Sequence, residues 1–197
     1  MLSPKVVKWA CHVFSDIIHR TEYEGLENIQ KDKLYVFAAN HVSASDPVMV
    51  MNVVDNLRIM AKAELFDVPV IRYFVKSANA IPIKRDKKDF GGVIHAAKEI
   101  KNKKHNLLIF PEGTRKAANK NIKAKDGAVC IAQAAGVEVI PVYLCENKGF
   151  LKKYKVKFGK PINVCEKLEE KEDKAKDRKN IKEYTKRVME SIYSMRD

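Results

Sequence analysis

Short apolar runs alternate along the chain with stretches in which apolar residues recur every three or four positions. Apolar runs rich in branched and aromatic side chains are typical of buried strands. They lie at 34–39, 58–61, 107–110, 139–144 and 154–158, with a strand tip at 79–85. The three-to-four spacing predicts helices at 4–19, 47–54, 70–76, 89–101, 127–135 and 181–195. Alternating strands and helices predict an α/β layer fold, here as a single domain over residues 1–197.

Three details within these elements give sharper expectations. Gly136 is expected to end the helix at 127–135, because glycine readily takes the left-handed conformation that caps helices. Pro141 has no N–H to give to a sheet, so the strand at 139–144 is predicted to be an edge strand or to begin there. The helix that Asp89 caps is expected to turn four apolar side chains inward: Val93, Ile94, Ala97 and Ile100.

The end of the first apolar run carries the first candidate chemistry. His41 follows the strand at 34–39, and Asp46 comes five residues later. Open α/β sheets bind ligands at the carboxyl ends of their strands. An extended chain would hold the two side chains roughly 16 Å apart, but the small residues between them and Pro47 favour a turn. A turn would form a pair in which Asp46 orients His41 as a general base.

The same residues also fit an ordinary helix start. In this interpretation Asp46 is the N-cap and Pro47 takes the first helical position. A histidine at a strand end is more often structural than catalytic, and the HxxxxD spacing by itself is a weak pattern. Spacing therefore leaves both interpretations open.

Composition restricts the class of protein and the kind of partner. The chain carries 38 lysines and arginines against 25 acidic residues, a formal net charge of +13. An excess of this size predicts an anionic partner: a lipid surface, a phosphorylated substrate, an acidic carrier protein or nucleic acid. The four cysteines have neither CxxC pairing nor the spacing of a metal site, which predicts reduced thiols in a cytosolic protein.

The sequence offers two candidates for membrane contact and none for a membrane span. The most apolar region, 128–145, is interrupted by polar residues, glycine and proline, whereas a span needs about 20 apolar residues. The helix at 4–19, within an N-terminal segment 1–20, has an apolar stripe that suits either a membrane interface or packing against the sheet. Residues 166–197 combine a charged segment with a C-terminal amphipathic helix.

Four predicted strand ends carry unusual polar or proline-marked sequences: NHVSASDP, IPIKRD, FPEGTR and VIPVYL. Their order and composition resemble the glycerolipid acyltransferase family, and the resemblance spans roughly residues 22–162. HxxxxD followed about seventy residues later by FPEGTR is a specific combination. The resemblance implies a single α/β domain with a mixed, mostly parallel central sheet flanked by helices.

The resemblance also implies a reaction. Members of the family move a fatty acyl group from acyl-CoA or acyl carrier protein to the sn-2 hydroxyl of 1-acylglycerol 3-phosphate, which forms phosphatidic acid. It casts His41 as the general base and Asp46 as the group that orients it, with direct transfer and no acyl-enzyme. Neither a metal nor a redox cofactor is implied.

Binding of the acceptor is expected to use the other motifs. Arg85 and Arg115 have forked guanidinium groups that match phosphate oxygens, and Lys62 adds a further positive charge. Glu112 is expected either to accept a hydrogen bond from the acceptor hydroxyl or to hold Arg115. Gly113 permits an unusual backbone angle and offers an amide to an anion, and Thr114 completes the motif.

The chain departs from the family pattern at two places. Asn79 stands where the second block usually begins with glycine, and asparagine tolerates the left-handed backbone angles that such a turn needs. Lys116 replaces a serine and begins a basic loop, 116–125, that fits an acidic carrier protein, phospholipid headgroups or solvent equally well.

These features together predict a peripheral enzyme on the cytoplasmic face of an anionic membrane, acting on a lysophospholipid and binding no nucleic acid. Glycerol 3-phosphate or another lysolipid is an alternative acceptor. A noncatalytic basic protein that binds membranes is the alternative from another class, although electrostatic binding needs neither the His41–Asp46 pair nor Glu112.

Overall fold

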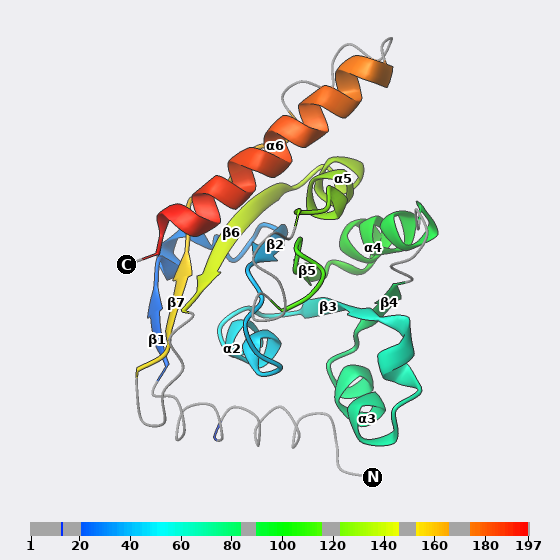
Figure 1. Cartoon of the computed structure of the whole chain (residues 1–197), viewed down its shortest axis with the longest axis vertical. Helices are drawn as coiled ribbons and strands as arrows, with labels where there is room; N and C mark the ends of the chain where they lie inside the picture. Colours follow the sequence, from blue (N-terminus) through cyan, green and yellow to red (C-terminus); the bar gives the residue numbers. More distant parts are fainter. Residues whose placement is uncertain are drawn as a thin grey trace.

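A computed structural model describes residues 21–83, 90–115, 123–145, 153–165 and 174–196, together with Val13. Seven strands form one sheet in the order β1-β7-β6-β2-β5-β3-β4 (Figure 1). They are β1 (Glu22–Glu24), β2 (Tyr35–Ala39), β3 (Leu57–Lys62), β4 (Ile81–Ile83), β5 (Asn106–Ile109), β6 (Glu138–Leu144) and β7 (Lys155–Phe158). Neighbouring strands are parallel except for β6 with β7. The predicted mixed, mostly parallel sheet is confirmed.

Helices cover both faces of this sheet. They are η1 (Leu26–Asn28), α2 (Asp46–Met51), η2 (Ala63–Phe66), α3 (Pro69–Ser77), α4 (Phe90–Lys103), α5 (Gly127–Ala135) and α6 (Lys174–Ser194), of which η1 and η2 are 3-10 helices. Helices α4, α5 and α6 pack on one face, and α2 packs on the other (Figure 1). Every residue of β2 is buried because alternate side chains enter the two apolar clusters, which explains its continuous apolar run.

The position of Pro141 differs from the prediction. Strand β6 lies in the interior of the sheet, between β7 and β2, so it is not an edge strand, and Pro141 lies in its middle. The Pro141 carbonyl accepts a hydrogen bond from Gly159 N at 2.8 Å, so its missing N–H also faces β7. The β7 ladder stops at Phe158 and is followed by a single bridge at Ile162. The proline therefore falls where that ladder is already interrupted.

The inner face of α4 also differs from the prediction in one residue. Ala97 and Ile100 are buried as expected and Val93 is partly buried, but Ile94 is 54% exposed. Successive helical residues are about 100° apart, so Ile94 lies to one side of the stripe that faces the sheet. The predicted helix end is confirmed, because Gly136 has φ 70° and caps α5.

Some predictions fall outside the part of the chain that the structure describes. The helix at 4–19 lies there except for Val13, as do the cap at Asp89 and the charged segment at 166–173. Within the described part, no helix combines the length and the apolar character that crossing a bilayer requires. Strand β1 was not predicted from the sequence.

Candidate active site at the ends of β2 and β5

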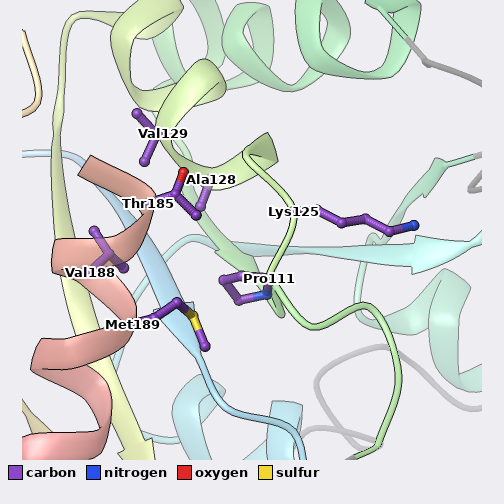
Figure 2. A pocket seen from close by; sticks show the side chains of 7 residues that line it. All are labelled: Pro111, Lys125, Ala128, Val129, Thr185, Val188 and Met189. Atoms are coloured by element: carbon purple, nitrogen blue, oxygen red, sulfur yellow. The ribbon is translucent and has the colours of Figure 1, made fainter. Parts of the chain in front are cut away.

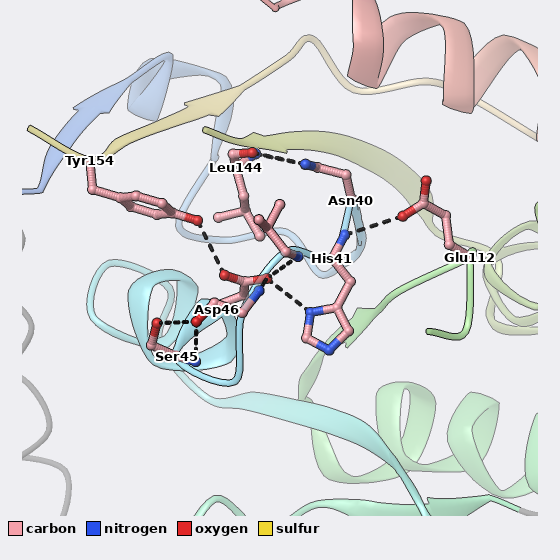
Figure 3. A network of polar contacts seen from close by, with 9 residues as sticks. Asn40, His41, Ser45, Asp46, Glu112, Leu144 and Tyr154 are labelled. Atoms are coloured by element: carbon pink, nitrogen blue, oxygen red, sulfur yellow. Dashed lines mark hydrogen bonds and ion pairs between the residues drawn. The ribbon is translucent and has the colours of Figure 1, made fainter. Parts of the chain in front are cut away.

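Asn40 links the end of β2 to the end of β6 by two hydrogen bonds. Its side-chain nitrogen donates to Leu144 O at 2.8 Å, and its side-chain oxygen accepts from Leu144 N at 2.7 Å. The side chain is fully buried, so it replaces a pair of backbone groups in the ladder between the two strands (Figure 3). This contact holds the next residue, His41, at the carboxyl edge of the sheet.

The turn after β2 brings Asp46 back to His41, as predicted. Asp46 Oδ2 lies 2.9 Å from His41 Nδ1 and also accepts the N–H groups of Val42 at 2.6 Å and Ser43 at 2.7 Å. Helix α2 begins at Asp46, with Ser45 rather than Asp46 as its N-cap. The pairing and the helix start therefore coexist, because Asp46 belongs to the first turn of α2 while its side chain points back to the strand end.

This hydrogen-bond pattern assigns the protons of the His41 ring. A carboxylate only accepts hydrogen bonds, and Oδ2 already receives two backbone N–H groups. His41 Nδ1 therefore carries a hydrogen and donates it to Asp46, which leaves Nε2 as the acceptor nitrogen of the neutral ring. The ring stacks on Phe110 with centroids 4.1 Å apart, and its side chain is 16% exposed. An imidazole with one acceptor nitrogen thus lies at the edge of the sheet, an arrangement that a general base requires.

Tyr154 is a further donor to Asp46. Its hydroxyl donates to Asp46 Oδ1 at 3.2 Å from the residue before β7 (Figure 3). Sequence reasoning missed this residue, which it assigned to a strand solely from the alternation at 154–158. No spacing relates Tyr154 to Asp46, because the two are 108 residues apart.

Glu112 joins the turn after β5 to the end of β2. Its Oε2 accepts from His41 N at 3.4 Å, and its Oε1 accepts from the hydroxyl of Tyr193 in α6. The two motifs are therefore brought together, although they are 71 residues apart. Glu112 is buried, and among the described residues Arg115 is not one of its hydrogen-bond partners. The expectation that Glu112 holds Arg115 is wrong for this structure.

The backbone of this turn is shaped by Gly113. Its φ is 68°, which agrees with the expectation of an unusual angle. Its N–H donates to Phe110 O at 2.9 Å, so the amide serves the turn itself and is not directed at an anion as expected. Asn79 likewise takes the left-handed conformation expected of a glycine substitute, with φ 48°.

The structure describes two of the three predicted cationic residues, Lys62 and Arg115. Thr114 and Arg115 are exposed directly after the Glu112 turn. Lys62 ends β3, and its Nζ lies 3.1 Å from Glu64 Oε1. Strands β2, β5 and β3 are parallel neighbours, so Lys62 lies on the same edge of the sheet as His41. Arg85 lies outside the described residues, so a phosphate site built from these side chains stays a prediction.

A small depression lies between the Pro111 turn, α5 and α6 (Figure 2). Its lining includes Ala128 and Val129 of α5 and Val188 and Met189 of α6. The space between these side chains is too narrow for a water molecule. It is therefore a packing seam and not a groove that could take an acyl chain.

Comparisons with known proteins agree with this geometry. The protein BAT2 of Brassica napus, a chloroplastic 1-acyl-sn-glycerol-3-phosphate acyltransferase, is 30% identical over 128 residues, which are 64% of this chain and 37% of that protein. The putative enzyme acl-2 of Caenorhabditis elegans is 32% identical over 139 residues, 69% of this chain and 49% of that protein. The Bacillus subtilis enzyme is 29% identical over 147 residues, 71% of this chain and 72% of that protein. The chain thus spans half or less of the plant and worm relatives.

A solved structure and a family model extend these similarities. The crystal structure of the 1-acyl-sn-glycerophosphate acyltransferase PlsC from Thermotoga maritima matches with a TM-score of 0.62 and 25% identity, covering 95% of this chain and 80% of that chain. The model of the Acyltransferase family matches residues 20–145. This match covers well over half of the chain and includes both the His41–Asp46 turn and the Glu112 turn, so the protein belongs to the acyltransferase family.

Proposed function

We propose that this protein is a 1-acylglycerol-3-phosphate O-acyltransferase. It transfers a fatty acyl group from acyl-CoA or acyl carrier protein to the sn-2 hydroxyl of its acceptor, and the product is phosphatidic acid. The observation that carries this proposal is the His41–Asp46 pair, whose open ring nitrogen lies at the sheet edge beside the Glu112 turn. The names of the relatives support the choice of acceptor.

The chemistry follows from the protonation of the His41 ring. Nε2 removes the proton of the acceptor hydroxyl while its oxygen attacks the thioester carbonyl. The new C–O bond forms, the C–S bond breaks, and the departing thiolate takes the proton back from the imidazolium. Asp46 stabilises the imidazolium between these two steps, as the carboxylate of a catalytic triad does. No covalent acyl-enzyme is needed.

Acceptor binding is assigned to the exposed residues beyond the Glu112 turn. Arg115 and Arg85 bind the phosphate of the acceptor, and Lys62 adds charge from the neighbouring strand. Thr114, next to Arg115, offers a hydroxyl at the same position. Glu112 already accepts hydrogen bonds from His41 N and Tyr193, and Gly113 bends the backbone. These two residues therefore shape the turn, and the residues after it hold the ligand.

The first test is turnover by the purified protein with lysophosphatidate and either acyl donor. His41→Ala should lower kcat by roughly a hundred- to ten-thousandfold, the usual contribution of a positioned base. His95→Ala is the matched control, because His95 is an exposed histidine of α4 and its loss should leave turnover unchanged. Equal rates for His41→Ala and the parent would remove His41 from the base role.

A panel of acceptors tests the substrate. Product from glycerol 3-phosphate or another lysolipid, with none from lysophosphatidate, would retain the chemistry and overturn the acceptor. No transfer to any acceptor by the folded parent would favour the noncatalytic basic protein.

The location is proposed to be peripheral, on the cytoplasmic face of an anionic membrane. The net charge of +13 supports attraction to anionic lipid. Removing residues 1–20 should reduce flotation with vesicles that contain phosphatidylglycerol. Unchanged flotation by a folded truncated protein would contradict a role for this segment in membrane binding.

A further inference from the structure

We propose that Tyr154 is a positioning residue for the His41–Asp46 pair, whose hydroxyl holds the Asp46 carboxylate in the rotation that turns Oδ2 toward the imidazole. This inference deepens the proposed function and rests on it for the role of His41. Tyr154 lies beyond residues 20–145 that the family model matches.

The donors to Asp46 fall into two groups. Oδ2 receives His41 Nδ1, Val42 N and Ser43 N, all from the turn that leads into α2. Oδ1 receives the hydroxyl of Tyr154, the residue before β7, which is 108 residues away in the sequence. A carboxylate rotates about the bond to its methylene carbon. A donor to each oxygen therefore fixes which oxygen faces the ring.

Burial keeps Tyr154 in the protonated form that this role requires. The side chain is 1% exposed and packs in the apolar cluster on the α2 face of the sheet. Burial is the largest cause that raises the pKa of Tyr154 well above its ordinary value. The negative charge of Asp46 and the hydrogen bond to it act in the same direction, with smaller effects from Cys145 and Tyr143. The hydroxyl therefore remains a donor.

Loss of this hydroxyl has a consequence for His41 with a definite sign. The Tyr154 dipole disperses part of the negative charge on Asp46. Without it, more of that charge faces the imidazole and favours the imidazolium. We therefore expect the midpoint of the His41 titration to move to higher pH, and the acidic limb of the rate profile to move with it.

The test compares Tyr154→Phe with Tyr35→Phe in the full chain. Tyr35 is the matched control, because it is also 1% exposed and belongs to the same apolar cluster. Its hydroxyl has no hydrogen-bond partner among the described residues. Nuclear magnetic resonance of the His41 ring gives the titration without substrate. The Tyr154→Phe midpoint should rise by roughly half a pH unit and kcat should fall about threefold, whereas Tyr35→Phe should match the parent in both.

Each outcome decides one question. A Tyr154→Phe titration that matches the parent and Tyr35→Phe would overturn the positioning role, whatever the turnover. A shifted titration in a protein that transfers no acyl group would support the positioning role and reject the proposed function. If Tyr154→Phe does not fold, the titration is measured in Tyr154→Met, which also fills the apolar cluster without a hydrogen-bond donor. A Tyr154→Met midpoint equal to those of the parent and Tyr35→Phe would overturn the positioning role.

Discussion

Two histidine–carboxylate contacts lie at opposite edges of the same sheet. His41 and Asp46 meet at 2.9 Å beyond the carboxyl end of β2. His105 and Glu99 meet at 3.5 Å before the amino end of β5. Both carboxylates are buried, so burial and proximity alone do not distinguish the proposed catalytic pair from a structural cluster.

The other neighbours of each carboxylate make the difference. Among the described residues, the backbone N–H groups of Val42 and Ser43 and the Tyr154 hydroxyl donate to Asp46 besides His41, and these donors are neutral. Glu99 also forms ion pairs with two cations: its Oε1 lies 2.7 Å from Lys103 Nζ, and its Oε2 lies 3.9 Å from Arg58 Nε. Its hydrogen bond to Lys103 is the first cause that lowers the pKa of Glu99. Burial, followed by the charge of Arg58, lowers the pKa of His105. A carboxylate surrounded by cations gives little assistance to a base.

The largest expected effect separates the two carboxylates by activity. Asp46→Asn should lower kcat on the order of a thousandfold, because the amide no longer selects the ring tautomer that leaves Nε2 open. Glu99→Gln should leave kcat within about twofold of the parent, since it lies at the far edge of the sheet. Steady-state rates of both variants check this. Comparable losses in the two variants would show that the clusters are not different in kind.

An intermediate effect separates two asparagines that bridge strands at the same two edges. Asn40 is fully buried and bonds both backbone groups of Leu144. Asn106 is half-buried and joins Tyr35 N at 2.9 Å to Asp55 O at 3.0 Å. Asn40→Ala leaves two buried groups unpaired and should lower the free energy of unfolding by about 3 kcal/mol, against about 1 kcal/mol for Asn106→Ala. Urea unfolding measures both values, and the reverse order would contradict the comparison.

The smallest expected effect is the pH dependence of stability at the far edge. Because the folded-state pKa of His105 lies below its ordinary value of 6.5, the unfolded chain binds more protons there. Stability therefore falls as the pH drops through 6.5 toward the lowered pKa and changes no further below it. His105→Gln should show a smaller fall than the parent between pH 7.5 and 5.5. The control is His95→Gln, which removes an exposed imidazole near the same carboxylate and should lose as much stability over this pH range as the parent. If His105→Gln also loses as much stability as the parent, His105 is not the source of the pH dependence.

The fold was predictable wherever one segment contained its own signal. The apolar runs of β2 and β6 are continuous because both faces of each strand are buried. Strand β1 escaped prediction because it is three residues long and partly exposed, and its partner β7 is remote in sequence. Pro141 was misplaced because the interruption that tolerates it depends on the return of the chain at Gly159.

In the candidate site, too, local contacts were predictable and contacts between remote segments were not. The His41–Asp46 contact was predictable because a five-residue turn forms it. The partners that hold this turn come from much farther along the chain: Leu144 bonds Asn40 across 104 residues, and Tyr193 bonds Glu112 across 81. Their own surroundings in sequence contain no sign of these contacts. The motifs therefore located the His41–Asp46 pair and the Glu112 turn, but not the side chains that hold them in place.

The bond from Tyr193 to Glu112 has a consequence for the order in which the protein is made. A ribosome synthesises the chain from its amino end, so the Glu112 turn leaves the ribosome long before α6 does. Until α6 has been synthesised and docked, Glu112 lacks the hydroxyl that Tyr193 supplies. A nascent chain that already contains all the sequence motifs is therefore expected to lack acyltransferase activity until α6 has been synthesised.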